Sequence, residues 1–284
     1  MTSDTVINIL ILILYIGMMV GMGIYSIRHT KTVDGFLLGG RGLGPWLSAF
    51  AYGTSFFSAV IFIGYAGKNG WNLGISAVWI GIGNAVIGCL LSWLVLAKRT
   101  RAMTHKLGSR TMPEFFGSRY NDNGMKIFCA LIIFVFLTPY AASVYMGLSY
   151  LFSAVFPAVD YIWWMVIMAV LTALYLSLGG YVATVLTDFV QGIIMIIGIV
   201  FVVYFVLSSD VVDGLKNGLQ SLSQIPKDGS NLTSPFGGQN WFNLLSLLVL
   251  TSLGTWGLPQ MVHKFYTIKD NKSIKQAAVI STLF

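Results

Sequence analysis

Oxygen groups that could bind a cation or a polar solute gather in one apolar stretch of the chain. The stretch, GPWLSAFAYGTSFFSAVIFIGYAG (residues 44–67), is long enough to cross a bilayer, which takes about 20 helical residues. Its middle contains Gly53, Thr54, Ser55 and Ser58. Glycine destabilises a helix by about 1 kcal/mol relative to alanine, and hydroxyl side chains compete for backbone hydrogen bonds. We expect a helix broken near mid-bilayer that offers oxygens to an ion or solute; the alternative is a small-residue face for close helix packing.

A second apolar run, residues 241–262, is interrupted by the sequence GTWGLP (residues 254–259). Proline removes an amide donor and clashes with the preceding turn, so we expect the helix to kink or unwind at Pro259. Two interrupted spans of opposite orientation are typical of inverted-repeat transporters, in which such helices enclose a site near the bilayer centre. The alternative is that Pro259 only ends the helix, because Lys264 follows closely and is expected in a basic loop.

Composition identifies the class of protein. Of 284 residues 56% are hydrophobic and 10% are charged, and the mean hydropathy is +0.78, which indicates an all-α polytopic membrane protein. We interpret residues 1–284 as a single transmembrane transporter domain that is incomplete at its C-terminus, because an eighth apolar run has barely begun at the end of the chain. The seven full spans are expected at about residues 6–25, 44–67, 73–97, 127–156, 161–178, 187–207 and 241–262.

The lysines and arginines indicate the orientation. If the N-terminus lies outside the cytoplasmic membrane, all of the 17 Lys and Arg residues except Lys68, Lys216 and Lys227 fall in inner segments, above all in the basic loop of residues 98–126. This segregation follows the positive-inside rule. It also explains the net charge of +7 without a nucleic-acid partner.

Three motifs in this order resemble the sodium:solute symporter family. They are GGRGLG (39–44) leading into AYGTS (51–55), LGGY (178–181) before TDFVQG (187–192), and GLPQ (257–260). The resemblance runs from about residue 8 to the end, and the sodium/proline and sodium/pantothenate symporters look most similar. It implies a LeuT-type fold of two inverted five-helix repeats after one extra helix. The chain would hold the extra helix, the first repeat and the start of the second.

The resemblance implies sodium as the coupling ion. By position, the backbone carbonyls of Thr54 and Phe57 would bind it, together with small and hydroxyl residues of a ninth helix that lies beyond Phe284. The proline symporters carry an aspartate where this chain has Phe56, so the analogy in coupling is incomplete.

Asp188 has two interpretations. A carboxylate at the edge of an apolar span is a candidate functional group, and the matching family aspartate can contribute to a second sodium site. Alternatively, Asp188 and Gln191 form a capping box at a helix start. Arg41 matches a family arginine linked to coupling, although the positive-inside rule also predicts it. Gly53 and Pro259, at the two interruptions, are the other expected coupling or gating residues.

For the solute, the resemblance points to Tyr140, which coincides with a tyrosine that the proline symporters use near their substrate. Ser55, Ser58, Thr255 and Trp256 flank the two interruptions and are the other expected binding residues. No arginine is expected in the cavity, so a small zwitterion or neutral solute is favoured, with proline first. A sugar or a carboxylate solute such as pantothenate is the alternative.

Two other classes are disfavoured. A channel would need a continuous polar lining, whereas the polar residues cluster at two interruptions. An enzyme would need a nucleophile, metal or acid–base set, and the titratable groups within the spans are essentially Asp188 and tyrosines. We therefore expect a non-enzymatic symporter in the lipid bilayer without an obligate protein partner; a channel-like or sensory membrane protein is a weaker alternative.

Overall fold

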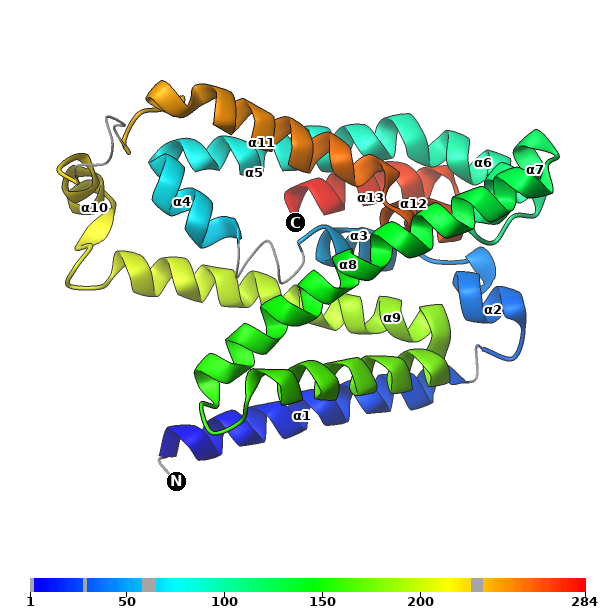
Figure 1. The fold of residues 1–284 in the computed structure, drawn as a ribbon, viewed down its shortest axis with the longest axis horizontal. Helices are drawn as coiled ribbons and strands as arrows, with labels where there is room; N and C mark the ends of the chain where they lie inside the picture. The colour runs from blue at the N-terminus through cyan, green and yellow to red at the C-terminus, as the bar shows by residue number, and fades with distance from the viewer. Residues whose placement is uncertain (1–2, 28–29, 58–64, 226–231) are drawn as a thin grey trace.

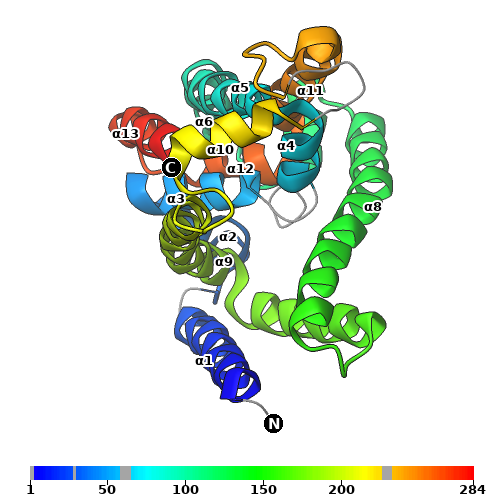
Figure 2. The same ribbon diagram turned by 90° about the vertical axis from the view of Figure 1, so that its left-hand side faces the viewer.

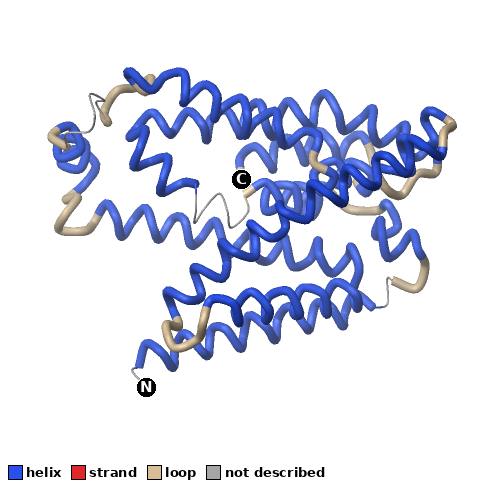
Figure 3. The backbone as a smooth tube through the Cα atoms, viewed as in Figure 1, coloured by secondary structure: helices blue, strands red, loops and turns tan. Residues whose placement is uncertain are grey.

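The computed structural model describes residues 3–27, 30–57, 65–225 and 232–284, which are almost entirely helical (Figures 1 and 3). The α-helices, in chain order, are α1 (Ser3–Ser26), α2 (Val33–Leu38), α3 (Pro45–Phe56), α4 (Gly67–Leu73), α5 (Val78–Gly83), α6 (Lys98–Leu107), α7 (Met112–Tyr120), α8 (Asn123–Val155), α9 (Tyr161–Leu207), α10 (Gly214–Ser223), α11 (Trp241–Leu253), α12 (Pro259–Thr267) and α13 (Asn271–Leu283). Between α5 and α6 the chain stays helical with π-type hydrogen bonding over Asn84–Leu91 and Trp93–Ala97.

Four described helices are long and apolar enough to cross a membrane: Val6–Ser26, Gly67–Leu107, Asn123–Val155 and Tyr161–Leu207. A bent pair, Trp241–Gly257 with Pro259–Thr267, makes a fifth if it counts as one span. The count of seven spans stays a prediction, because the second expected span includes residues 58–64, which lie outside the described residues. Helix α8 lies along one side of the molecule, away from α13 on the other (Figure 2).

The longest helix, α9, contains two of the expected spans. They meet at Gly180, whose backbone (φ 55°, ψ −151°) departs from the helical conformation, and the two halves run in opposite directions (Figure 1). A Cβ atom at this position would lie 2.8 Å from the Phe36 carbonyl oxygen. The turn expected at residues 179–181 is therefore confirmed, and it requires glycine for both its conformation and its close contact.

The expected basic loop between the third and fourth spans is instead mostly helical, since α6 and α7 occupy it. Helix α7 begins with a Thr-x-x-Glu sequence in which the Thr111 hydroxyl accepts a hydrogen bond from the Glu114 N–H (3.3 Å). Helix α13 begins in the same way: the Asp270 carboxylate accepts a hydrogen bond from the Ser273 N–H (2.7 Å), and this backbone contact lowers the pKa of Asp270.

A buried aromatic cluster holds α3 against α12. The Tyr52 and Phe265 rings stack with centroids 5.9 Å apart, and both contact Trp93, at 5.2 and 4.9 Å. The Tyr52 hydroxyl donates a hydrogen bond to the Gly88 carbonyl (3.0 Å) and lies 3.0 Å from the Ser92 hydroxyl, so its polar end is also satisfied. The two interrupted spans thus share one packed core.

The same two helices are also tied together by backbone. The Leu43 N–H, just before α3, donates to the Thr267 carbonyl (3.2 Å), and the Lys269 N–H donates to the Leu43 carbonyl (3.0 Å). The guanidinium of Arg101 on α6 donates to the Ile268 carbonyl (2.8 Å). The start of α3 and the end of α12 therefore form one hydrogen-bonded unit.

Candidate solute and ion site

The first interrupted span contains the predicted break. Helix α3 ends at Phe56, and Phe57 leaves the helical conformation (φ −91°, ψ 74°) while its N–H still bonds to the Gly53 carbonyl (2.9 Å). Beyond the part of this span that the structure does not describe, the next α-helix is α4, in the segment where a loop is expected around residues 68–72, and the turn to the following helix comes at Gly74. Of the residues at this break, Ser58 lies outside the described residues.

Close helix packing, the alternative interpretation of the small residues, is also present. A Cβ atom at Gly53 would lie 2.4 Å from the ring of Phe284 in the last turn of the chain. A Cβ atom at Gly192 on α9 would lie 2.7 Å from the Phe50 ring and 3.1 Å from the Thr54 methyl group. Small residues thus let α3 contact two neighbouring segments closely, and the break and the packing coexist.

The second interrupted span bends where the sequence predicts it. A 3₁₀ turn (Gly254–Gly257) is followed by extended Leu258 (φ −67°, ψ 127°), and Pro259 opens α12 at the first helical position, where no N–H donor is needed. The segments on either side meet at 50°. Because α12 continues past Lys264, Pro259 does not simply end the helix.

A cavity of about 570 Å³ lies beside the end of α3, a volume in the range of small-molecule sites. It brings together four of the predicted site residues: Thr54, Ser55, Phe57 and Tyr140. Five further polar residues line it that sequence reasoning missed as site residues: Tyr15, Thr172, Tyr175, Gln191 and Gln260. Among them, Gln191 donates a hydrogen bond to the Tyr15 hydroxyl.

Two other predicted solute residues, Thr255 and Trp256, do not line this cavity. The Thr255 hydroxyl donates to the Ser252 carbonyl in its own helix (2.9 Å), and the Trp256 indole N–H donates to the Ile87 carbonyl (3.0 Å). Their polar atoms therefore stabilise the bent span and its neighbour.

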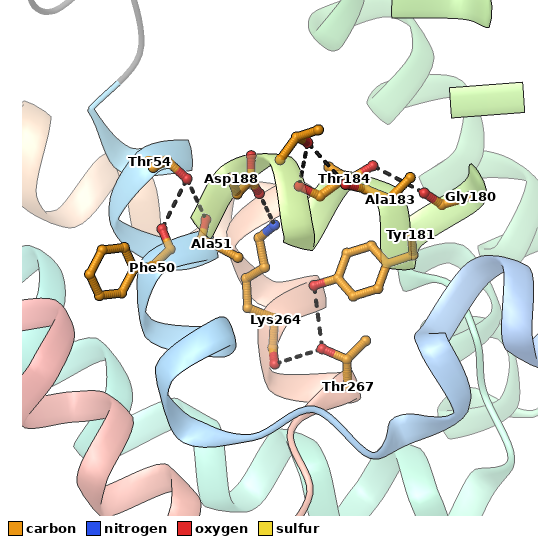
Figure 4. Close-up of polar contacts among 11 residues, drawn as sticks. Phe50, Ala51, Thr54, Gly180, Tyr181, Ala183, Thr184, Asp188, Lys264 and Thr267 are labelled. Atoms are coloured by element: carbon orange, nitrogen blue, oxygen red, sulfur yellow. Dashed lines mark hydrogen bonds and ion pairs between the residues drawn. The ribbon is translucent and has the colours of Figure 1, made fainter. Parts of the chain in front are cut away.

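A buried ion pair lies next to α3 (Figure 4). The Asp188 carboxylate on α9 lies 3.4 Å from Nζ of Lys264 on α12, and the two side chains are only 16% and 4% exposed. Nζ of Lys264 also lies 5.2 Å from the centroid of the Tyr181 ring, whose hydroxyl is 3.3 Å from that of Thr267. Lys264 was expected in a basic loop, and that expectation is wrong.

The capping-box interpretation of Asp188 and Gln191 is also wrong. The second half of α9 is helical from the residues after Gly180, so Asp188 lies inside the helix. Its carboxylate faces Lys264, beside the turn of α3 that carries Ala51 and Thr54 (Figure 4). The Thr54 hydroxyl itself donates to the Phe50 carbonyl (2.9 Å).

Arg41 lies at the connection between α2 and α3, with a left-handed backbone (φ 54°). Its guanidinium donates a hydrogen bond to the Ser109 carbonyl (2.7 Å) in the segment between α6 and α7. This contact links the segment before α3 to the segment between α6 and α7. A role of Arg41 in coupling stays a prediction.

Comparison with known proteins identifies the family. The model of the sodium:solute symporter family matches residues 36–284. The chain belongs to this family. It is 33% identical over 272 residues to sodium/proline symporter 2 of Staphylococcus saprophyticus, and 32% identical over 267 residues to the sodium/proline symporter of Staphylococcus aureus. These matches cover 94% and 93% of the chain and 51% and 50% of the two relatives, so the chain spans about half their length.

A solved structure supports the fold. The substrate-bound outward-open state of a Na⁺-coupled sialic acid symporter matches with a TM-score of 0.79 and 18% sequence identity, over 98% of this chain and 56% of that one. The predicted LeuT-type fold is confirmed, with the chain corresponding to its first repeat and the start of the second. This symporter-family chain is a multi-pass membrane protein, and the relatives that it matches are transporters.

Proposed function

We propose that the protein to which this chain belongs is a sodium-coupled symporter. It imports a small organic solute across the cytoplasmic membrane by alternating access, with its N-terminus outside. The observation that carries the proposal is the cavity beside the break in α3. Its wall includes Thr54, Ser55 and Phe57 from one interrupted span and Gln260 from the other, which is the arrangement that inverted-repeat transporters use for binding.

Sodium fits the oxygen donors at this break. Carbonyl oxygens at the end of a helix are hard ligands that suit a cation such as sodium, and we propose those of Thr54 and Phe57 as its ligands. Asp188 is the second proposed ion-binding group, and in this structure its carboxylate is paired with Lys264. The names of the relatives support sodium as the ion.

The lining of the cavity favours a small zwitterion or neutral solute. The described residues that line it include hydroxyl, phenol and amide side chains among apolar ones, and none of them is Lys, Arg, Asp or Glu. A strongly acidic solute would lack a counter-charge in this part of the site. Proline is the leading solute, and the two sodium/proline symporters at 32–33% identity support it. A sugar or pantothenate is the alternative.

The coupling mechanism follows from the connections of α3. Sodium at the break would hold the end of α3 in the geometry that binds solute. Because α3 is joined to α12 by the aromatic cluster and by the Leu43–Thr267 and Lys269–Leu43 hydrogen bonds, we expect both interrupted spans to move as one body during alternating access. Arg41, Gly53 and Pro259 lie at the ends and interruptions of these spans, where coupling changes would be transmitted.

Uptake of labelled proline by the full-length protein in proteoliposomes tests the proposal. We expect accumulation above the external concentration with an inward sodium gradient, and only equilibration when the gradient is collapsed or choline replaces sodium. If proline is not taken up but a sugar or pantothenate is, the choice of solute is wrong and the class stands. Entry that is equal with and without sodium would contradict coupled transport.

A further inference from the structure

The side-chain amide of Gln260 has unused hydrogen-bonding capacity at the wall of the cavity. Both its Oε1 and its Nε2 are buried and have no hydrogen-bond partner among the described residues. An amide offers two donors and an acceptor oxygen, and leaving such a group buried and unpaired destabilises a folded protein. Buried polar groups are nearly always paired in native proteins, so this one requires an explanation.

Other polar groups in the same lining are satisfied from within the protein. The Thr54 hydroxyl donates to the Phe50 carbonyl, and the Gln191 amide donates to Tyr15. Among the described residues that line the cavity, Gln260 alone has buried side-chain polar atoms without a partner. The cavity that Gln260 lines offers a place for the missing partner.

The position of Gln260 in the fold strengthens this inference. It is the second residue of α12, directly after the bend, so its backbone is fixed by the packed helix. It also lines a second cavity of about 290 Å³, together with His263 and Tyr266, and the Tyr266 hydroxyl is likewise buried without a partner. Gln260 thus lines both the cavity beside α3 and a smaller one between α12 and the start of α7.

We propose that Gln260 binds the transported solute directly, an inference that rests on the proposed function. Its Nε2–H donates to a carboxylate or carbonyl oxygen of the solute, and its Oε1 accepts a hydrogen bond from a solute N–H. A solute that satisfies both atoms carries an oxygen acceptor close to an N–H donor, as an amino or imino acid does. Gln260 is thereby a specificity-determining residue of the site.

Sodium-driven uptake by full-length Q260L tests this, because leucine fills a similar volume without either polar atom. We expect the KM for proline to rise about tenfold or more, since the bound solute loses hydrogen bonds and keeps desolvated polar groups without a partner, while Vmax stays within about threefold. The control is Q276L, a matched change at an exposed position on α13, which should leave KM unchanged.

The charged variant Q260E distinguishes direct binding of the solute by Gln260 from a purely structural role of this residue. Glutamate at this position keeps an acceptor but loses the donor and repels a carboxylate, so Q260E should lower the ratio of proline to prolinamide uptake relative to wild type by about tenfold or more. Q276E should leave that ratio unchanged. If Q260L does not reach the membrane, Q260N, which keeps the amide but withdraws it by one methylene, should still raise KM.

Wild-type KM and an unchanged solute ratio in the Gln260 variants would overturn the role of this residue, while sodium-driven uptake by the wild type would leave the proposed function intact. Sodium-independent uptake by the wild type would instead overturn the proposed function, whatever the variants do.

Discussion

Replacing Lys264 with methionine is expected to destabilise the protein severely. The substitution leaves the Asp188 carboxylate buried without its counter-ion, and removing one partner of a buried pair costs about 3–5 kcal/mol. Because folded proteins are stable by only about 5–15 kcal/mol, this is a large share of the total. We expect a sharp loss of folded protein and a lower melting temperature in the full-length protein, measured by thermal-shift size-exclusion chromatography.

The double variant D188N/K264M is the control, because it removes both charges at once. We expect it to recover most of the stability that K264M loses, and the stability of D188N alone completes the cycle that gives the coupling energy between the two sites. If the single and double variants are equally unstable, the ion pair is not the cause.

The same samples test the ion role of Asp188. If its carboxylate binds sodium once Lys264 is gone, sodium chloride should raise the melting temperature of K264M more than choline chloride does.

Gly180→Ala is the second substitution with a large expected effect. The backbone at Gly180 has φ 55° and ψ −151°, a region that residues with a Cβ avoid, at a cost of about 1–3 kcal/mol. In addition, the new Cβ would lie 2.8 Å from the Phe36 carbonyl oxygen, a backbone atom that cannot move away cheaply. We expect the turn between the two halves of α9 to fail, with little monodisperse full-length protein in size-exclusion chromatography.

Gly198→Ala provides a matched control in the same helix, because a Cβ there meets no atom within 4 Å. In a helix interior this change should be neutral or stabilising by up to about 1 kcal/mol. If Gly180→Ala and Gly198→Ala lose equal amounts of monodisperse protein, then α9 is sensitive to any replacement of glycine by alanine. The special role of Gly180 would then be contradicted.

Local sequence chemistry was sufficient to predict where the helices are interrupted. Glycine and proline act on the backbone of their own segment, so the end of α3, the bend at Pro259 and the turn at Gly180 could all be expected without knowledge of the fold. The family resemblance then supplied the arrangement of these helices.

The ion pair could not be predicted in this way. Asp188 and Lys264 are 76 positions apart, and each had a sufficient local explanation, as a helix cap and as an inner-loop charge. Both explanations failed because the helices extend further than the apolar runs suggested: α9 is helical again right after Gly180, and α12 continues to Thr267. Only tertiary packing shows that the two charges meet.

The cavity lining was predicted in part for a similar reason. Ser55 and Tyr140 line it as expected, whereas the polar atoms of Thr255 and Trp256 bond elsewhere, because the 3₁₀ turn before Pro259 decides which way each side chain points. Gln260 carried a usable signal, since it is the polar residue directly after the proline of the interrupted span. Its unpaired amide is visible only in the structure.

Reciprocal binding measurements on the purified full-length protein test the central claim, that sodium and solute bind in coupled fashion at the break in α3. The Kd for proline is measured without sodium and at saturating sodium, and the Kd for sodium is measured with and without proline. We predict that each ligand tightens the other by the same factor, greater than one, as thermodynamic linkage requires. Two affinities that do not depend on each other would contradict coupling at this site.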